Sequence, residues 1–414
     1  MNPADWDRGV IVVGAGAAGL WAAGVAARAG QQVLLLEKTS RTGTKILASG
    51  GTHCNLTTTL DPVEAARLFG RRGERFLRPA FDALPPLALR ERFEALGVPT
   101  VEAPLEKVFP ASGRARDVRD ALEREAREAG VDIVFGAPVT AVRTNGEGFE
   151  LEVEGGRRAI CRNLLLCPGG KSYPRTGTTG DGYAWLESLG LHLVEPVPAL
   201  VPLASSDLGI QGLAGIALQD AEVRACDGDG KTLARRSRPV LFTHRGLSGP
   251  GPMDVSVHVA RGEAGHIRLD LVPGLDREEL RGRLIELAGA RGGPRLARAL
   301  PELPRRLVGE LSGSLGLGSN PEVSTLSRSS RHALVEAIKG WSIPVEGTLG
   351  WDQAEVTAGG LDLRAVNPRT MEVNAHPGLF VFGELLDLDG PIGGLNFQAA
   401  FACGELAGLA LAGA

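Results

Sequence analysis

A glycine-rich turn near the start of the chain constrains the fold more than any other feature. An apolar run at residues 10–13 leads into Gly14, Gly16 and Gly19, which have the spacing Gly-x-Gly-x-x-Gly, and an alanine-rich segment follows. In a strand–turn–helix unit, the first glycine permits the tight turn, the second lets a pyrophosphate approach the backbone, and the third lets helix and strand pack closely. The sequence therefore predicts a dinucleotide site, with phosphates held by unpaired N–H groups of the helix.

A second apolar run supports this interpretation. Residues 33–36 lead to Glu37, 18 residues after Gly19. A carboxylate at this position can accept hydrogen bonds from both ribose hydroxyls of an adenosine, and it disfavours a ribose 2′-phosphate. Three glycines alone are also typical of a flexible loop. The strand before them, the helix after them and the acid at this distance favour the nucleotide site.

Composition limits the remaining possibilities. A chain of 414 residues is too long for one core and suggests two or three domains, and its net charge of −4 gives no general attraction for nucleic acid or anionic membranes. Five cysteines without a C-x-x-C pair favour a reduced cytoplasmic chain with no metal site. Residues 10–27 lack charge, but they are too short for a membrane span and follow Asp5 and Asp7.

The patterns predict three domains. Residues 1–190 and 346–414 have alternating strands and helices, which is typical of a discontinuous Rossmann-like α/β domain. Within it we expect helices at 15–29 and 115–129, a meander of four strands between 131 and 170, and a closing amphipathic helix after Gly394. Residues 191–272, which include a hairpin around 227–230, predict an inserted β-barrel or sandwich. Residues 273–345 predict a small helical subdomain.

Six separated blocks resemble the YhiN-type flavoproteins, also called BaiN-type, and the likeness covers almost the whole chain. These flavoproteins bind FAD on a fold related to the two-dinucleotide-binding flavoenzymes. The blocks are residues 44–57, 109–122, 165–190, 242–250, 356–361 and 382–408. The resemblance implies a Rossmann-like FAD-binding domain and an FAD-dependent oxidoreductase.

The resemblance also implies which residues hold FAD, from its pyrophosphate to its ring. The pyrophosphate would lie on Gly14, Gly16, Ala17, Ala18 and Gly19, and the adenosine ribose on Glu37. Lys38, Lys45, Gly50 and Gly51 would follow the cofactor towards its ribityl chain, and Val139 would contact the adenine. Gly383 and Glu384 would contact the ribitol, with Asp387 close by, and Gly169 is a further expected cofactor residue. The isoalloxazine would face Gly393, Gly394, Asn396 and Phe397. A positive helix end there would stabilise an anionic reduced flavin.

One block departs from the family pattern. The commoner family form reads Ser-Gly-Gly-Gly-Arg-Cys-Asn, whereas this chain has Thr52 and His53 in place of the last glycine and the arginine. An arginine stays charged at physiological pH, but a histidine titrates near neutrality. The charge at this position would therefore depend on pH.

Several side chains are candidates for chemistry. Cys54, with His53 and Asn55, lies in the block nearest the expected flavin edge, where a thiol could protonate a carbon as hydride reaches its neighbour. The alternative for Cys54 is a small buried apolar residue. Lys171 follows a strand end and belongs either to the site or to a surface loop. His244 either faces the flavin or bonds a loop backbone.

The leading functional hypothesis is reduction of a carbon–carbon double bond. Only one nucleotide-binding turn is visible, so NAD(P)H is expected as a transient small-molecule reductant. The resembled family is linked to dihydrouridine formation in ribosomal RNA and to reduction of unsaturated steroids. Ribosomal RNA is the preferred partner, although the chain has only two tyrosines and therefore little surface on which bases could stack. A small unsaturated metabolite is the alternative substrate. No membrane partner is expected, and the oligomeric state stays open.

A contrasting hypothesis is a flavin-bearing RNA- or partner-binding protein whose FAD is structural or redox-sensing. The chain also has arginines that could form basic patches: Arg71, Arg72, Arg75 and Arg78, with Arg114, Arg116 and Arg119. Charges on one face of a helix are, however, usually only solvated.

Overall fold

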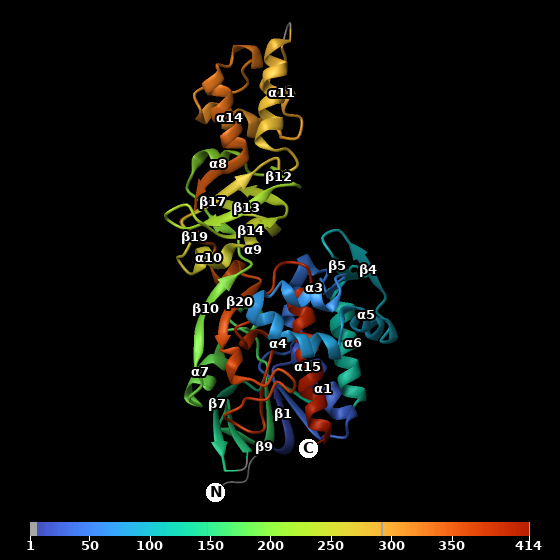
Figure 1. The fold of residues 1–414 in the computed structure, drawn as a ribbon. Helices are drawn as coiled ribbons and strands as arrows, with labels where there is room; N and C mark the ends of the chain where they lie inside the picture. Colours follow the sequence, from blue (N-terminus) through green and yellow to red (C-terminus); the bar gives the residue numbers. More distant parts are fainter. Residues whose placement is uncertain (1–5, 147, 291–292, 414) are drawn as a thin grey trace. The chain divides into compact units, whose positions relative to one another are not determined.

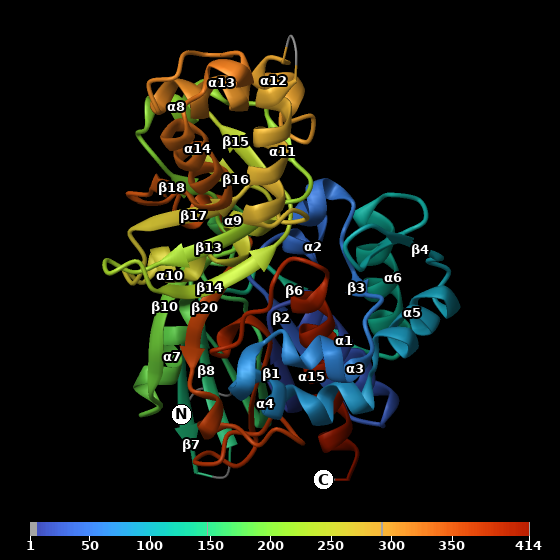
Figure 2. The same ribbon diagram turned by 45° about the horizontal axis from the view of Figure 1, so that its top comes forward.

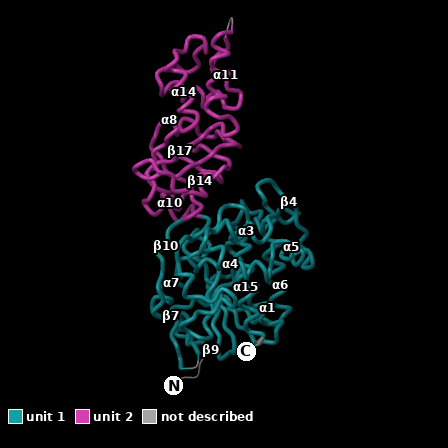
Figure 3. The backbone as a smooth tube through the Cα atoms, in the orientation of Figure 1, with its two compact units in different colours: residues 1–198, 355–414 teal, residues 199–354 magenta. Residues whose placement is uncertain are grey.

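The chain forms two compact units in the computed structural model, which describes residues 6–146, 148–290 and 293–413. Unit 1 comprises residues 1–198 and 355–414, and unit 2 comprises residues 199–354 (Figure 3). Each unit has its own hydrophobic core. Within the described ranges, no helix combines the length and the apolar character needed to cross a membrane.

A mixed sheet of seven strands forms the centre of unit 1 (Figure 1). Four strands run parallel in the order β6-β2-β1-β9, and β8 and β7 continue the sheet in antiparallel pairing. The strands are β1 (Trp6–Val13), β2 (Val33–Glu37), β6 (Asp132–Phe135), β7 (Val139–Asn145), β8 (Gly148–Val153), β9 (Arg157–Leu166) and β21 (Leu379–Val381).

Strand β9 organises the edge at which the parallel strands end. It pairs with β1 along one side, and with β8 and then β21 along the other. Because β21 is parallel to β9 and β9 to β1, the loops after Val13, Leu166 and Val381 leave the sheet at the same edge. In open α/β sheets, ligands bind at this edge.

Helices cover the sheet of unit 1. They are α1 (Ala17–Arg28), α2 (Thr44–Ala48), α3 (Pro62–Arg67), α4 (Gly70–Ala83), α5 (Pro86–Ala95), α6 (Ala115–Glu128), α7 (Asp181–Ser188) and α15 (Leu395–Ala410). Helix α15 lies beside α1 in both views (Figures 1 and 2). The two helices approach so closely at Gly404 that a Cβ atom there would lie only 2.9 Å from the carbonyl oxygen of Ala18.

Two small sheets complete unit 1. One has the order β3 (Thr57–Thr58), β5 (Lys107–Pro110) and β4 (Thr100–Ala103). The other pairs β10 (Leu193–Ala199) with β20 (Val356–Leu361).

Unit 2 contains two antiparallel sheets and a group of helices. The first sheet has the order β12 (Ala217–Leu218), β15 (Val240–Thr243), β16 (Gly246–Ser248), β11 (Leu203–Ala204), β19 (Gly347–Thr348). The second has the order β14 (Thr232–Ser237), β13 (Glu222–Cys226), β17 (His266–Asp270), β18 (Trp341–Pro344). The helices are α8 (Leu208–Gly212), α9 (Pro250–Asp254), α10 (Ser256–Ala260), α11 (Arg277–Gly289), α12 (Leu296–Ala299), α13 (Arg305–Ser314) and α14 (Arg328–Gly340).

The structure confirms the predicted Rossmann-like α/β fold and the helices near residues 15–29 and 115–129. The hairpin around residues 227–230 is also confirmed, as β13 and β14. One expectation is wrong: β6 is not the first strand of the meander. It pairs in parallel with β2 at the far edge of the sheet, and only β7, β8 and β9 form the meander. An α/β crossover through α6 returns the chain to that edge, which short-range sequence pattern does not reveal.

Candidate functional site

The turn between β1 and α1 has the geometry expected of a phosphate cradle. Gly14 has φ +105°, and a Cβ there would lie 2.6 Å from the carbonyl oxygen of Cys167. A Cβ at Gly19 would lie 1.9 Å from the carbonyl oxygen of Gly14. At Gly16, by contrast, no heavy atom lies within 4 Å of the position that a Cβ would take, so space is open beside the backbone at the start of α1.

Glu37 lies beside this turn, where the adenosine ribose is expected. Its Oε2 accepts a hydrogen bond from the backbone N–H of Ala15 at 2.8 Å, and its Oε1 accepts one from Thr39 N at 2.8 Å. Each carboxylate oxygen keeps a second lone pair that can accept a ribose hydroxyl. The neighbouring Lys38 is engaged elsewhere, because its Nζ lies 2.6 Å from Asp181 Oδ2 and donates to Thr179.

A polar group that we name the Glu384 cluster lies at the ends of the central strands. It consists of the side chains of Lys45, Ser172, Thr357 and Glu384. Glu384 Oε1 accepts from Thr357 N at 2.8 Å, from Thr357 Oγ1 at 2.9 Å and from the Ser172 hydroxyl. Lys45 forms an ion pair with Glu384 and also donates to Ser172. Its four members come from four separate segments of the chain.

The fold brings the Glu384 cluster next to the phosphate cradle. Glu384 lies in the 3-10 turn Gly383–Leu385, directly after β21. Gly383 has φ +73°, and a Cβ there would lie 3.4 Å from Ala18 Cβ in the first turn of α1. The sequence prediction includes Lys45 and Glu384 but misses Ser172 and Thr357. Both belong to blocks that carry the family resemblance, so the polar residues of those blocks are the signal that could have found them.

A third part of the site forms where residues 49–55 meet the start of α15. A Cβ at Gly394 would lie 2.1 Å from the carbonyl oxygen of Thr57 and 2.9 Å from Asn55 Oδ1. At Gly393, in contrast, only Leu105 O lies within 4 Å of such a Cβ, at 3.9 Å. A Cβ at Gly393 would therefore meet no close neighbour, although Gly393 itself is buried, whereas Gly16 is half-buried.

The segment before Asn55 has an unusual backbone. Gly50 and Gly51 have φ of +55° and +65°, and Thr52 and Cys54 have φ of +75° and +59°. Left-handed conformations are uncommon for residues other than glycine, and they concentrate at functional sites. The commoner family form has glycine where this chain has Thr52, and a glycine would adopt this positive φ without strain.

The three candidate catalytic residues of this segment have different environments. Cys54 is fully buried, and burial raises the pKa of its thiol to about 12. His53 is exposed, and its Nδ1 lies 2.7 Å from the carbonyl oxygen of Gly113, so this nitrogen donates. Asn55 Oδ1 accepts a hydrogen bond from Val108 N at 3.2 Å. Only His53 combines an ionisable group with access to solvent.

A family profile described as the HI0933-like protein Rossmann domain matches residues 8–410. The chain belongs to this family. The HI0933-like chain is 33% identical over 405 residues to a ribosomal RNA dihydrouridine synthase of Escherichia coli, covering 95% of this chain and 96% of that one. It is also 33% identical over 408 residues to a 3-dehydro-bile acid delta(4,6)-reductase of Clostridium scindens, covering 97% and 98%.

Solved structures support the same fold. A 3-ketosteroid-delta4-(5alpha)-dehydrogenase of Rhodococcus jostii RHA1 superposes with a TM-score of 0.58 at 17% identity, covering 100% of the HI0933-like chain and 98% of the other. This likeness concerns the fold. The family and its named relatives make this chain an FAD-dependent oxidoreductase.

The residues of the HI0933-like chain fit FAD. The open backbone at Gly16 leaves room for a pyrophosphate beside the first turn of α1, which contains no acidic side chain. Glu37 has acceptor capacity left for the ribose. At the other end, the uncrowded backbone at Gly393 and the start of α15 would offer N–H groups and a positive helix end to the ring.

The remaining expected site residues lie in several places. Val139 is buried at the start of β7, and Gly169, with φ +85°, faces Thr178. Asp387 N donates to Leu361 O. Asn396 forms two hydrogen bonds with the backbone of Gly390 and Phe397 stacks on Phe401. His244 is exposed in the turn between β15 and β16 of unit 2.

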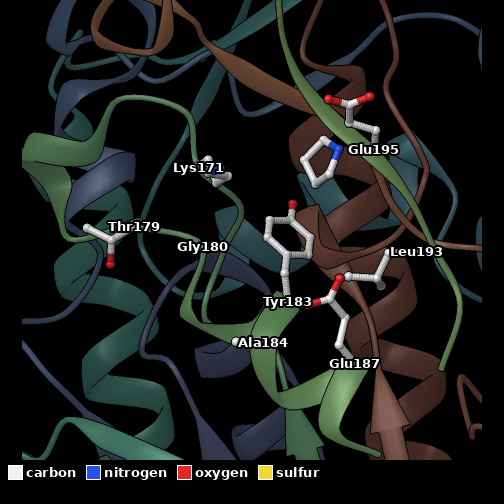
Figure 4. A pocket seen from close by; sticks show the side chains of 9 residues that line it. Lys171, Thr179, Gly180, Tyr183, Ala184, Glu187, Leu193 and Glu195 are labelled. Carbon is white, nitrogen blue, oxygen red and sulfur yellow. The ribbon is translucent and has the colours of Figure 1, made fainter. Parts of the chain in front are cut away.

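Lys171 lines a pocket of about 510 Å³ in unit 1 (Figure 4). The other lining residues are Thr179, Gly180, Tyr183, Ala184, Glu187, Leu193, Glu195 and Pro196. The pocket adjoins the Glu384 cluster, because Tyr183 donates its hydroxyl to the backbone oxygen of Glu384 at 3.1 Å. Its lining contains no residue of the phosphate cradle.

The buried thiol of Cys54 predicts a pH effect on stability. Because burial raises its pKa from 9.0 to about 12, the folded protein keeps a proton that the unfolded chain releases above pH 9. The contribution of the buried thiol to the free energy of unfolding is complete below pH 9. It falls by about 1.4 kcal/mol per pH unit as the pH rises towards 12. Urea unfolding of wild type and Cys54→Ala at about pH 8 and about pH 10.5 should show the smaller alkaline loss in the variant. An equal loss in both proteins, or rapid reaction of this thiol with a thiol reagent in the folded state, would contradict the assignment.

Proposed function

We propose that this chain reduces a carbon–carbon double bond conjugated to a carbonyl group, with NAD(P)H as reductant and uracil bases of ribosomal RNA as the acceptor. The single observation that carries the proposal is the 33% sequence identity, over nearly the full length, to two relatives whose names state their reactions. One is named for forming dihydrouridine and another for reducing a steroid with conjugated double bonds. Both names describe saturation of such a bond, and the Escherichia coli relative is named for acting on ribosomal RNA.

The site supports this chemistry through positioning. Bound FAD supplies hydride transfer between the reductant and the acceptor. In the proposed arrangement, Gly14, Gly16 and Glu37 hold the adenosine half, and the Glu384 cluster lies along the ribityl chain. The N-terminal end of α15, with Gly393 and Gly394, favours negative charge at the ring.

The buried Cys54 supports a packing role for the thiol better than a proton donor. Its side chain is fully buried, and its raised pKa makes proton release unfavourable at neutral pH. His53 and Asn55 remain as the polar groups of this segment that substrate could approach. We also propose a cytoplasmic location, which agrees with five cysteines that are all free.

Flavin spectroscopy under anaerobic conditions tests the proposed reaction. NADPH or NADH should bleach the absorbance of FAD bound to the protein. Ribosomal RNA from an Escherichia coli strain lacking its own dihydrouridine synthase should then restore it, with dihydrouridine appearing in the RNA. RNA from the parent strain, whose target uridine is already reduced, is the matched control.

Other outcomes would contradict parts of the proposal. A flavin that neither NADH nor NADPH bleaches would exclude the reductase and favour a structural or redox-sensing FAD. Reoxidation by a 3-oxo steroid with conjugated double bonds, but not by the unmodified RNA, would replace RNA with a small unsaturated acceptor.

A further inference from the structure

Helix α4 carries three exposed arginines on one face, which we name the α4 arginine stripe: Arg71, Arg75 and Arg78. Their spacing of four and three residues places them one above another along the helix, over about 10 Å at 1.5 Å per residue. The opposite face, with Gly73, Phe76, Leu77, Ala80 and Phe81, is buried. The stripe is therefore a continuous strip of permanent positive charge on the surface of unit 1.

Acidic residues lie near the stripe but do not pair with its arginines: Asp82, one turn after Arg78 on the same face, forms no ion pair among the described residues. Across the described residues, none of the stripe's three side chains forms an ion pair or a hydrogen bond. Glu74 on the flank of α4 pairs instead with Arg67, at 3.7 Å. Arg114, just before α6, and Arg119, within α6, differ because each pairs with an aspartate, whereas the exposed Arg116 forms no ion pair among the described residues.

Structural stability does not explain the stripe. Arg71 lies in the first turn of α4, where the helix dipole disfavours a cation, and that turn contains no acidic residue. Because the Arg71 side chain forms no ion pair or hydrogen bond among the described residues, its guanidinium is available for a ligand. Its planar fork matches phosphate oxygens in two parallel hydrogen bonds.

Helix α4 also lies next to the segment that leads to the expected flavin end. It packs against α15 (Figures 1 and 2). Phe69, at the start of α4, lies against Gly390, and Gly73 faces Leu388 at a distance that leaves room for no side chain. Residues 388 and 390 precede Gly393 by only a few positions in the chain, so the buried face of α4 packs on the segment that leads to the expected flavin end.

We propose that the α4 arginine stripe binds the phosphate backbone of the RNA whose uridine is reduced. This inference deepens the proposed function and rests on its RNA acceptor. An anionic membrane is the other polyanion to consider. A membrane-bound helix needs large apolar side chains beside its basic ones, and none of the exposed large apolar residues in the described chain lies on α4. The observations therefore favour RNA.

A triple variant, R71Q/R75Q/R78Q, tests the stripe in the FAD-loaded full chain. The matched control is R298Q/R305Q/R328Q, which removes three exposed arginines of unit 2 that also lack side-chain partners among the described residues. Binding of fluorescein-labelled oligouridine is measured by anisotropy at several salt concentrations. The α4 variant should have a salt slope smaller by about 2, at about 0.7 per phosphate contact, and the control a slope near wild type. A fourfold increase in salt should then weaken wild-type binding about twentyfold more than binding by the α4 variant.

Thermal unfolding and reduction by NADPH should be unchanged in both variants, because none of the replaced arginine side chains forms an ion pair or a hydrogen bond within the described part of the chain. Equal slopes in wild type and the α4 variant, or an equal decrease in both variants, would overturn the inference. Binding to phosphatidylserine vesicles that is lost in the α4 variant, without RNA binding, would assign the stripe to a membrane. If RNA binding requires the stripe but no dihydrouridine forms, the inference stands and the proposed function fails.

Discussion

Gly19→Ala is expected to destabilise the apoprotein strongly, whereas Gly16→Ala is expected to leave it folded and to weaken FAD binding. A Cβ at Gly19 would lie 1.9 Å from the carbonyl oxygen of Gly14, a backbone atom that no side-chain rotation can move. Replacing a helical glycine with alanine gains about 1 kcal/mol of helix propensity, but overpacking of this kind costs about 3 kcal/mol. The net loss should be about 2 kcal/mol or more.

The two substitutions are matched, because each adds one methyl group to the same turn. Gly16 has φ −79° and ψ −169°, which alanine also adopts, and no atom lies within 4 Å of the new methyl group. The free energy of unfolding of the Gly16→Ala variant should differ from that of wild type by less than about 1 kcal/mol. The added methyl group would occupy the space proposed for the pyrophosphate, so FAD affinity should fall about tenfold or more, or at least about 1.4 kcal/mol.

Thermal unfolding of the apoproteins and titration with FAD check both halves of this prediction. Equal stability of the two variants would contradict the packing role of Gly19. Normal FAD affinity in Gly16→Ala would contradict the assignment of the phosphate position, without affecting the packing argument.

The strand–turn–helix unit could be predicted from sequence because its determinants are local. The glycines, the apolar strand residues and Glu37 lie within one short segment, and each acts through its own backbone or nearest neighbours. The closing helix shows where local pattern stops being sufficient. The sequence predicts an amphipathic helix, but α15 has few exposed residues, because it packs against α1 on one side and α4 on another.

The Glu384 cluster could be predicted only in part, since it is a tertiary feature. Lys45, Ser172, Thr357 and Glu384 come from α2, the loop after β9, β20 and the turn after β21. No spacing in the sequence relates these positions. Similarly, Arg75 of α4 and Arg119 of α6 look equivalent as charges in the sequence, and only the structure shows that Arg119 pairs with Asp120 while Arg75 forms no ion pair among the described residues.

Glu384→Ala should be the most damaging single change to the polar part of the site. The side chains of Glu384 and Lys45 are only 16% and 25% exposed, so removing the carboxylate leaves a largely buried ammonium without its counter-charge. It also removes the acceptor of the Thr357 N–H and of the Ser172 hydroxyl. Breaking a buried ion pair from one side typically costs about 3–5 kcal/mol, and for this partly exposed pair we expect about 3 kcal/mol.

A double-mutant cycle with Lys45→Met separates the ion pair from the other contacts. The double variant should be more stable than Glu384→Ala alone, because the uncompensated charge is gone, with a coupling of about 1–3 kcal/mol. Glu336→Ala is the matched surface control: its partner Arg277 is 49% exposed, and the loss should stay below about 1 kcal/mol. Urea unfolding of the apoproteins measures the change in the free energy of unfolding for the two single variants of the cycle, the double variant and the surface control. Strict additivity of Lys45→Met and Glu384→Ala would mean that the ion pair does not stabilise the cluster, and the carboxylate would then act through Thr357 and Ser172 alone.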